Sequence, residues 1–531
     1  MEVKSFGRVN ILCKTNALCV KGLCRGEGTS MTKHDDTTIT SSTSAGVGFF
    51  GLVGMVVSSC IGSGVFKLTG QLGAVASPGA AIVAWLITGL GFLFLALSLA
   101  NLGTKRPESD GVIAYADDGF GPFHGFISGW GYWLSAWLGN VAFGTMVAQT
   151  LGSDYCFGQI LPGFFTVDGN PTFGGILVVS VVLWLITLLV IHGVESASFL
   201  NAVVMVVKVA SIALFIMFSL FAFNAGIFTT DFWGNLSSSA GIIADAGGDA
   251  LGSVTNQIEQ CFLIMMWTFI GIEGASVMSK RAAKKSEVGS ATVLGLVILL
   301  VIYIGASILP YGVMPYKDFI DIAYDPNSTP AMILVFEYLA PGWGGAFISW
   351  SIIISVIGSW LSFTMLPAET TSVMAEHHLL PAKWDERNSH NAPQFSLIIV
   401  GALTEIFIIV ATLSSDAYNF AFSMCTVTIV ITWAYAAAYQ CKYSAEHHEG
   451  AQLVAGIIAL AFQVIAMCLG GNWQFLLTAC LGYIPGFFFY AAARKEVGGG
   501  LSKAEIVSCI IIAIIGVSAI PLNMAGIISV F

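Results

Sequence analysis

Long apolar stretches, separated by short polar segments, follow one another along the chain from residue 47 onward. About 20 apolar residues in a helix cross a hydrocarbon core of roughly 30 Å, so each stretch is interpreted as a membrane-spanning helix. The pattern predicts an all-α polytopic membrane protein with twelve spans and a thirteenth at the C-terminal end. The predicted spans are 47–66, 79–102, 121–151, 172–192, 198–223, 258–279, 289–312, 345–370, 395–413, 418–440, 451–469, 472–493 and 505–528.

The composition excludes an ordinary soluble domain. Of the 531 residues, 56% are hydrophobic and only 10% are charged, whereas soluble proteins carry about 25% charged residues. The net charge of −10 lies in the loops and therefore says little about partners. We expect a protein surrounded by the lipid bilayer, with no nucleic acid as a partner.

Residues 1–46 are predicted to be a cytoplasmic, disordered tail. The first 30 residues lack the apolar stretch of about 7–15 residues that a signal peptide needs. Met31, followed by the polar TKHDDTTITSSTS, would make a natural start. Residues 1–30 are therefore expected to lie upstream of the true start or in a disordered tail, rather than in a domain.

The placement of basic residues predicts the orientation. Of the 21 Lys and Arg residues, 18 lie in the N-terminal tail or in loops on the same side of the membrane. The exceptions are Lys67 at the end of the first span, Lys208 inside the fifth, and Lys317 on the other side. Because basic loops face the cytoplasm, we expect the N-terminus inside the cell.

The first span contains a glycine-rich interruption, SSCIGSGVF at 58–66. Gly62 and Gly64 weaken a helix by about 1 kcal/mol each relative to alanine. Irregular backbone at membrane depth is tolerated only where it is buried in protein or lines a wet cavity. The alternative is that the two glycines only permit close helix packing.

A matching interruption, WTFIGIEGASV at 267–277, lies in the sixth span. Because the two breaks are five spans apart, they fit inverted repeats of spans 1–5 and 6–10, each opening with a discontinuous helix. A half-helix that restarts presents free N–H groups, which suit a carboxylate, and one that stops presents carbonyls, which suit an ammonium group. A zwitterionic amino-acid head group matches both ends, whereas the GxGxxG and P-loop motifs of phosphate sites are absent.

Several motifs together carry a resemblance. GSGVF and WTFIGIEGASV resemble the corresponding segments of the amino acid–polyamine–organocation superfamily. Three further motifs resemble its basic amino acid/polyamine antiporter branch, namely SDGVIAYADDGFG, GWGYWLSAWLGN and SKRAAKKSEVGSATVLG. Within that branch the arginine–ornithine antiporters are most similar. The resemblance implies a LeuT-like core of five-plus-five inverted repeats at 47–440, with discontinuous helices 1 and 6. Residues 441–531 would then add further transmembrane helices to a multi-pass protein of a bacterial inner (plasma) membrane.

The resemblance also implies a site for the head group. The backbone amides of Ser63 and Gly64, next to Gly62, would bind the substrate carboxylate. Carbonyls around Cys60, Trp267 and Ile270 would receive the α-ammonium group. Trp267 would close over the substrate as a gate, although a Trp in a membrane helix is more often an interface anchor.

For the substrate side chain, the resemblance implies a pocket on the third and eighth spans. Asn140, with carbonyls near Ser135 and Ala136, would accept hydrogen bonds from a cationic group; the alternative is a helix–helix hydrogen bond from Asn140. Phe363 falls where the family places an aromatic residue, commonly Trp, and Trp360 is its rival.

Ionisable residues at membrane depth indicate function because they are costly there. Glu273, between the glycines of the sixth span, can titrate or contact a cationic substrate. Relatives have a lysine like Lys208 that occupies the place of a sodium ion, so Lys208 is expected to tie span 5 to span 1; snorkelling and proton coupling are the alternatives. Glu369 is interpreted as solvated near a span end, and Glu405 has no assigned role.

The favoured function is exchange of cationic amino acids, arginine for ornithine, by alternating access. The alternatives are an amino acid/decarboxylated-amine antiporter (histidine/histamine or lysine/cadaverine) and a proton-coupled amino acid permease. An enzyme is not expected, because all eight histidines lie in loops or at span ends. We expect no metal and no cofactor; the partners are small amino acids and, as a further expectation, a second copy in a homodimer.

Overall fold

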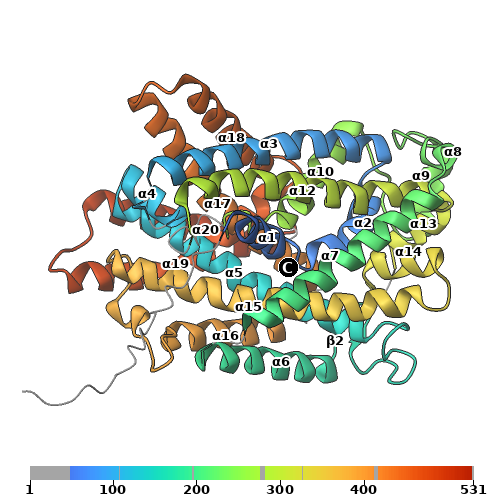
Figure 1. Ribbon diagram of the computed structural model, residues 1–531, viewed down its shortest axis with the longest axis horizontal. Helices are drawn as coiled ribbons and strands as arrows, with labels where there is room; N and C mark the ends of the chain where they lie inside the picture. The colour runs from blue at the N-terminus through green and yellow to red at the C-terminus, as the bar shows by residue number, and fades with distance from the viewer. Residues whose placement is uncertain are drawn as a thin grey trace, which may run out of the picture. The chain divides into compact units, whose positions relative to one another are not determined.

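The computed structural model describes residues 48–106, 108–109, 111–193, 197–274, 282–325, 327–411 and 417–528. The predicted tail at 1–46 and the end of the sixth span, 275–279, lie outside the described residues. Figure 1 shows that the described chain consists almost entirely of helices. Its longer helices are α1 (Phe49–Cys60), α2 (Gly64–Val75), α3 (Pro78–Lys105), α4 (Val112–Phe120), α5 (Pro122–Leu151), α6 (Phe173–Ile191), α7 (Ala197–Ala222), α9 (Ser237–Asp245), α10 (Val254–Thr268), α12 (Val288–Ile308), α13 (Tyr316–Ala323), α14 (Ala331–Leu339), α15 (Gly344–Glu376), α16 (Gln394–Ala411), α17 (Ala417–Glu446), α18 (Gly450–Cys468), α19 (Asn472–Glu496) and α20 (Lys503–Met524).

Short elements fill the connections. They are α8 (Ala225–Phe228), 3₁₀ turns at Lys285–Glu287, Leu309–Gly312 and Ala382–Asp385, and a hairpin of β1 (Thr166–Val167) and β2 (Asn170–Pro171). The hairpin strands are antiparallel and pair Thr166 with Pro171. Two of the 3₁₀ turns contribute buried residues, among them Tyr311 and Trp384.

Within the described residues, nine helices are long and apolar enough to cross a membrane, or ten if the bent pair α1–α2 is one span. The remaining predicted spans correspond to α5, α10 and α16. Of these, α16 has only a short apolar part at Gln394–Val410, and α10 ends at Thr268. The prediction of a polytopic helical protein is therefore confirmed, while the number of spans stays a prediction.

Helix α5 lies at the centre of the packing. Every residue from Gly125 to Thr150 is buried, and α5 packs against α4, α15, α16 and α17 (Figure 1). A second group places α3 against α10, α12 and α18, with α1 against α12. The broken helix α1–α2 thus lies within the protein, with packing partners along both halves.

The helix that follows the first break extends beyond the predicted end of the first span. The expected end at residue 66 falls within α2, so Lys67 lies in the first turn of a second half-helix and is buried. The predicted end is early because the polar residues of α2 lower its apolar density, although two of them donate hydrogen bonds to other helices. The Thr69 hydroxyl donates to the carbonyl of Ala306 at 2.8 Å, and Gln71 Nε2 donates to Asn419 Oδ1 at 3.0 Å.

Candidate functional site

The first helix is interrupted between Cys60 and Gly64, where the axes of α1 and α2 bend by 49°. Two aromatic rings pack directly on this backbone. A Cβ atom at Gly62 would lie 3.2 Å from the Phe143 ring, and one at Gly64 would lie 2.8 Å from Trp267 Cδ1. The glycines therefore do permit close packing, as the alternative held, but the helix is also broken where they stand.

The start of α2 presents backbone amides inside the protein. The first N–H groups of a helix lack intrahelical acceptors and carry the positive end of its dipole. Ser63 and Gly64 occupy this position and are buried. The Tyr418 hydroxyl, from α17, lies 3.3 Å from Ser63 Oγ. The amides are thus held in a dry environment, where an anionic group would satisfy them.

The second interruption follows directly after α10. Gly271 has φ of +105°, a conformation that favours glycine, and a Cβ there would lie 2.9 Å from the Ser59 carbonyl. The Ser59 hydroxyl donates to the Gly271 carbonyl at 2.8 Å. Cys60 Sγ lies 3.6 Å from the Phe269 carbonyl. The two breaks, far apart in sequence, are therefore in direct contact.

A buried tyrosine bridges the two breaks. The Tyr303 hydroxyl, from α12, lies 2.9 Å from the Cys60 carbonyl and 2.7 Å from the Thr268 carbonyl. The Cys60 carbonyl also accepts from the Gly62 amide at 2.9 Å. Because a carbonyl has two lone pairs, that of Cys60 is already engaged in this conformation. To accept a hydrogen bond from the substrate ammonium group, as predicted, the Cys60 carbonyl would have to lose the hydrogen bond from Tyr303 or from the Gly62 amide.

A small cavity of about 10 Å³ lies at the first break. That volume is enough for about one water molecule, so the cavity is too small for an amino acid in this conformation. All six predicted head-group residues line it. The lining residues are Ser59, Cys60, Gly62, Ser63, Gly64, Phe143, Trp267, Ile270 and Phe363.

A second cavity of about 10 Å³ adjoins the first and shares Ile270 and Phe363 with it. Its other lining residues are Tyr132, Ser135, Ala136, Glu273, Leu366 and Ile429. Glu273 is buried and accepts a hydrogen bond from Trp433 Nε1 at 3.2 Å. Phe363 thus separates a cavity lined by helix ends from one that contains a carboxyl group.

Asn140 lies beside Phe363 on the neighbouring helix α5. Its Nδ2 donates to the Phe363 carbonyl at 3.3 Å. Its Oδ1 is buried and has no hydrogen-bond partner among the described residues. The rival of Phe363, Trp360, instead packs near Gly144, where a Cβ would lie 3.2 Å from the indole. The structure thus brings Phe363, rather than Trp360, to the cavities.

Lys208 connects α7 to the broken helix. Its Nζ donates to the Ser58 carbonyl at 3.1 Å and to Ser359 Oγ at 2.7 Å. Ser359, on α15, in turn donates to the Ile61 carbonyl at 3.1 Å. The ammonium group therefore lies at the C-terminal end of α1, where the helix dipole favours a cation. Its proposed role as a sodium substitute stays a prediction.

A larger cavity of about 420 Å³ lies beyond Trp267. The Trp267 ring contacts the ring of Phe422, with centroids 6.1 Å apart, and Phe422 lines this larger cavity. Lys67 also lines this cavity, and its ammonium lies 4.4 Å from the centroid of the Tyr418 ring. Trp267 and Phe422 thus lie between this larger cavity, here called the vestibule, and the small cavity at the first break.

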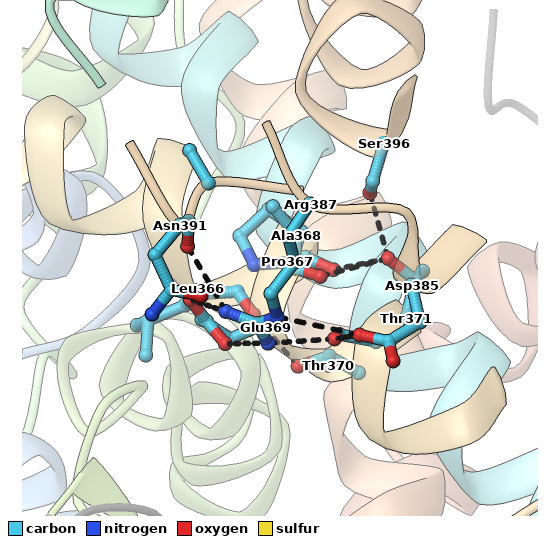
Figure 2. A network of polar contacts seen from close by, with 12 residues as sticks. Leu366, Pro367, Ala368, Glu369, Thr370, Thr371, Asp385, Arg387, Asn391 and Ser396 are labelled. Atoms are coloured by element: carbon cyan, nitrogen blue, oxygen red, sulfur yellow. Dashed lines mark hydrogen bonds and ion pairs between the residues drawn. The ribbon is translucent and has the colours of Figure 1, made fainter. Parts of the chain in front are cut away.

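Two further carboxylates have partners that the sequence did not reveal. Glu369 keeps 44% of its side chain exposed, in agreement with its interpretation as a solvated residue, and its Oε2 also pairs with Arg387 Nη2 at 3.0 Å, as Figure 2 shows. Glu405 accepts from the Ser180 hydroxyl at 2.6 Å. The loop that carries Arg387 thus folds back onto α15.

Sequence reasoning missed Tyr303, Ser359, Phe143, Tyr132 and Trp433. Each lies within an apolar helix, and the only available signal was a polar or aromatic side chain at membrane depth. Such side chains are numerous in this chain, which has 14 Tyr and 13 Trp residues. Their roles follow only from the packing of α5, α12, α15 and α17 around the breaks.

Two joined helix breaks, buried among apolar helices beside a small cavity, are the arrangement expected at the substrate site of a membrane transporter. A family model described as amino acid permease matches residues 47–515. The chain belongs to the amino acid permease family, which confirms the resemblance and makes the protein a multi-pass transporter rather than an enzyme.

Several characterised antiporters are similar to this chain over most of its length. An arginine/ornithine antiporter of Latilactobacillus sakei is 44% identical over 486 residues, which cover 90% of this chain and 97% of the relative. An arginine/ornithine antiporter of Pseudomonas aeruginosa is 36% identical over 463 residues, 84% of this chain and 90% of the relative. An arginine/agmatine antiporter of Chlamydia abortus is 34% identical over 492 residues, 90% of this chain and 97% of the relative.

Substituting Gly64→Ala tests the contact between α2 and Trp267. The new methyl group would lie 2.8 Å from Trp267 Cδ1 and 3.2 Å from Thr268 Cγ2, so the indole must move. We expect amino acid uptake into proteoliposomes to fall at least about tenfold, the effect of roughly 1.4 kcal/mol. Gly54→Ala is the matched control on α1, because its methyl would meet only the flexible end of Met205 at 3.3 Å. Equal uptake by both variants would show that the contact between Gly64 and Trp267 is not needed for transport.

Substituting Lys208→Met tests the anchor of the broken helix. The variant leaves the Ser58 carbonyl without this donor, at a cost of about 1–3 kcal/mol. We expect a clearly lower melting temperature of the purified protein. Val206→Met, on the exposed face of the same helix, should leave it unchanged. An unaltered melting temperature in Lys208→Met would rule out a stabilising role.

Proposed function

We propose that the protein exchanges arginine for ornithine across the membrane by alternating access. The observation that carries the proposal is the direct contact between the two helix breaks, which places the amides at the start of α2 and the carbonyls of both breaks around one small cavity. The printed names of the relatives supply the substrates. An exchange with a decarboxylated amine is less favoured, since the arginine/ornithine antiporters reach higher identity than the arginine/agmatine antiporter.

The substrate carboxylate binds at the amides of Ser63 and Gly64 in this proposal. These groups point into the protein from the positive end of α2, and Gly62 leaves room beside them. The α-ammonium group binds at carbonyls of the second break near Trp267 and Ile270, and at that of Cys60 once Tyr303 releases it. Trp267 closes the site from the vestibule.

The cationic side chain then extends past Phe363 toward the second cavity. Its acceptors are the carbonyls near Ser135 and Ala136 and the Oδ1 of Asn140, with Glu273 at the far end. Neutral acceptors bind a cation weakly enough to release it. Because arginine and ornithine both carry one net positive charge, their exchange moves no net charge.

The proposed architecture follows the family. Residues 47–440 form a ten-helix core of five-plus-five inverted repeats, 441–531 add further spans to a total of thirteen, and 1–46 form a cytoplasmic tail. The N-terminus lies on the cytoplasmic side of a bacterial plasma membrane, and the vestibule then opens toward the outside of the cell. Homodimer formation is part of the same proposal. The two breaks at corresponding positions support the repeats, and the basic loops support the orientation.

Counterflow in proteoliposomes tests the exchange. Vesicles loaded with ornithine should take up labelled arginine rapidly, and empty vesicles should not. Uptake should be independent of sodium, because Lys208 occupies the C-terminal end of α1, and independent of an imposed membrane potential. Equal uptake into empty vesicles would refute exchange. Potential-dependent exchange for agmatine in place of ornithine would instead favour the amine alternative.

Trp267→Leu tests the gate within the same assay. The variant keeps an apolar side chain but loses the ring contacts with Phe143 and Phe422. Aromatic contacts contribute about 0.5–1.5 kcal/mol beyond their area, so the half-saturating arginine concentration should rise by up to about tenfold. Trp350→Leu, at an exposed position, is the control. An unchanged affinity and rate in Trp267→Leu would remove Trp267 from the gate.

A further inference from the structure

Helix α15 contains a proline in its interior. Pro367 lies well inside Gly344–Glu376 and is buried. Proline has no N–H to donate, so the carbonyl four residues earlier loses its intrahelical partner. In α15 that carbonyl belongs to Phe363, the aromatic residue that lines both small cavities. The proline thus leaves one unpaired carbonyl beside the candidate site.

Asn140 supplies the missing donor. Its Nδ2 lies 3.3 Å from the Phe363 carbonyl oxygen, and its side chain is fully buried on α5. Because a carbonyl only accepts, the amide must turn its NH₂ group toward Phe363. The Asn140 Oδ1 consequently faces away from it, and no described residue donates to this oxygen. A buried acceptor without a donor is costly, which points to a ligand.

We propose that Pro367 is a positioning residue for substrate recognition. By withholding a helical donor from the Phe363 carbonyl, it orients the Asn140 amide so that Oδ1 accepts an N–H from the cationic side chain of the substrate. The inference rests on the proposed function for the identity of that substrate. The hydrogen-bond arrangement itself depends only on α5 and α15.

The segment of α15 beyond the proline is held by its own contacts, seen in Figure 2. The Thr371 hydroxyl lies 3.2 Å from the Pro367 carbonyl and 2.6 Å from Ser396 Oγ. Arg387 pairs with Glu369 at 3.0 Å and donates to Ser372 Oγ at 2.7 Å. A Pro367→Ala variant should therefore keep this segment in place while adding an N–H that competes with Asn140.

A purely structural role makes a different prediction. If Pro367 only bends the helix and Asn140 only ties α5 to α15, the two substitutions affect stability and rate independently of each other. If Pro367 acts through Asn140, their effects are coupled, and the coupling concerns the end of the substrate side chain. A double-mutant cycle separates these cases.

The first experiment measures arginine counterflow in Pro367→Ala, Asn140→Ala and the double variant. Pro367→Ala should raise the half-saturating concentrations of arginine and ornithine several-fold. Inhibition by norvaline, which is ornithine without its terminal amino group, should stay unchanged. In the Asn140→Ala background, Pro367→Ala should change neither the half-saturating concentrations of arginine and ornithine nor the inhibition by norvaline. Pro521→Ala, an exposed proline within α20, is the control. Equal shifts for norvaline and ornithine, or additive effects, would overturn the proposal.

The second experiment needs no transport and so separates this proposal from the proposed function. Asn140→Ala should lower the melting temperature of the wild type, because it strips the Phe363 carbonyl of its donor. The loss should be smaller in the Pro367→Ala background, where the helix supplies an N–H. Equal losses in both backgrounds would refute the hydrogen-bond arrangement. Coupled losses without arginine–ornithine exchange by the wild type would refute the proposed substrates alone.

Discussion

The structure depends on backbone groups that a helix break leaves unpaired within a membrane protein. In lipid no water is available to pair with them, so each must find a partner in the protein or in a ligand. The break between α1 and α2 meets this constraint at a point that α5, α7, α10, α12, α15 and α17 surround. Their packing is arranged around Cys60–Gly64, and the second break at Gly271 is positioned by the same contacts.

The two helix ends at the first break differ in whether the protein provides hydrogen-bond partners for their backbone groups. At the end of α1, the carbonyls of Ser58, Cys60 and Ile61 accept from Lys208, Tyr303 and Ser359. At the start of α2, the amides have no intrahelical acceptor, and the nearby Tyr418 hydroxyl binds the Ser63 side chain instead. The carbonyl end is therefore satisfied by the protein, whereas the amides of Ser63 and Gly64 have no acceptor among the described residues. Within the proposed function, this asymmetry favours a carboxylate at the amide end.

The sequence predicted the breaks because glycines at membrane depth are a local signal. It placed the end of the first span wrongly because Lys67, Thr69 and Gln71 look like loop residues until their tertiary partners are known. It could not choose between Trp360 and Phe363, which are one helical turn apart, since the choice depends on which face of α15 meets α5. Pro367 was equally visible in the sequence, but its consequence for Asn140 required the position of a second helix.

The amide end of α2 also gives a physical reason for exchange, within the proposed function. An empty transporter that changes conformation keeps buried amides unpaired, at a cost of about 1–3 kcal/mol for each group. A bound carboxylate removes that cost and brings an ammonium group to the opposing carbonyls. The barrier between the two conformations would then be lower for the loaded protein than for the empty one. The transporter would thus return to its first conformation only after binding a second amino acid. The coupling between export of one substrate and import of the other then follows from the hydrogen bonds of one broken helix.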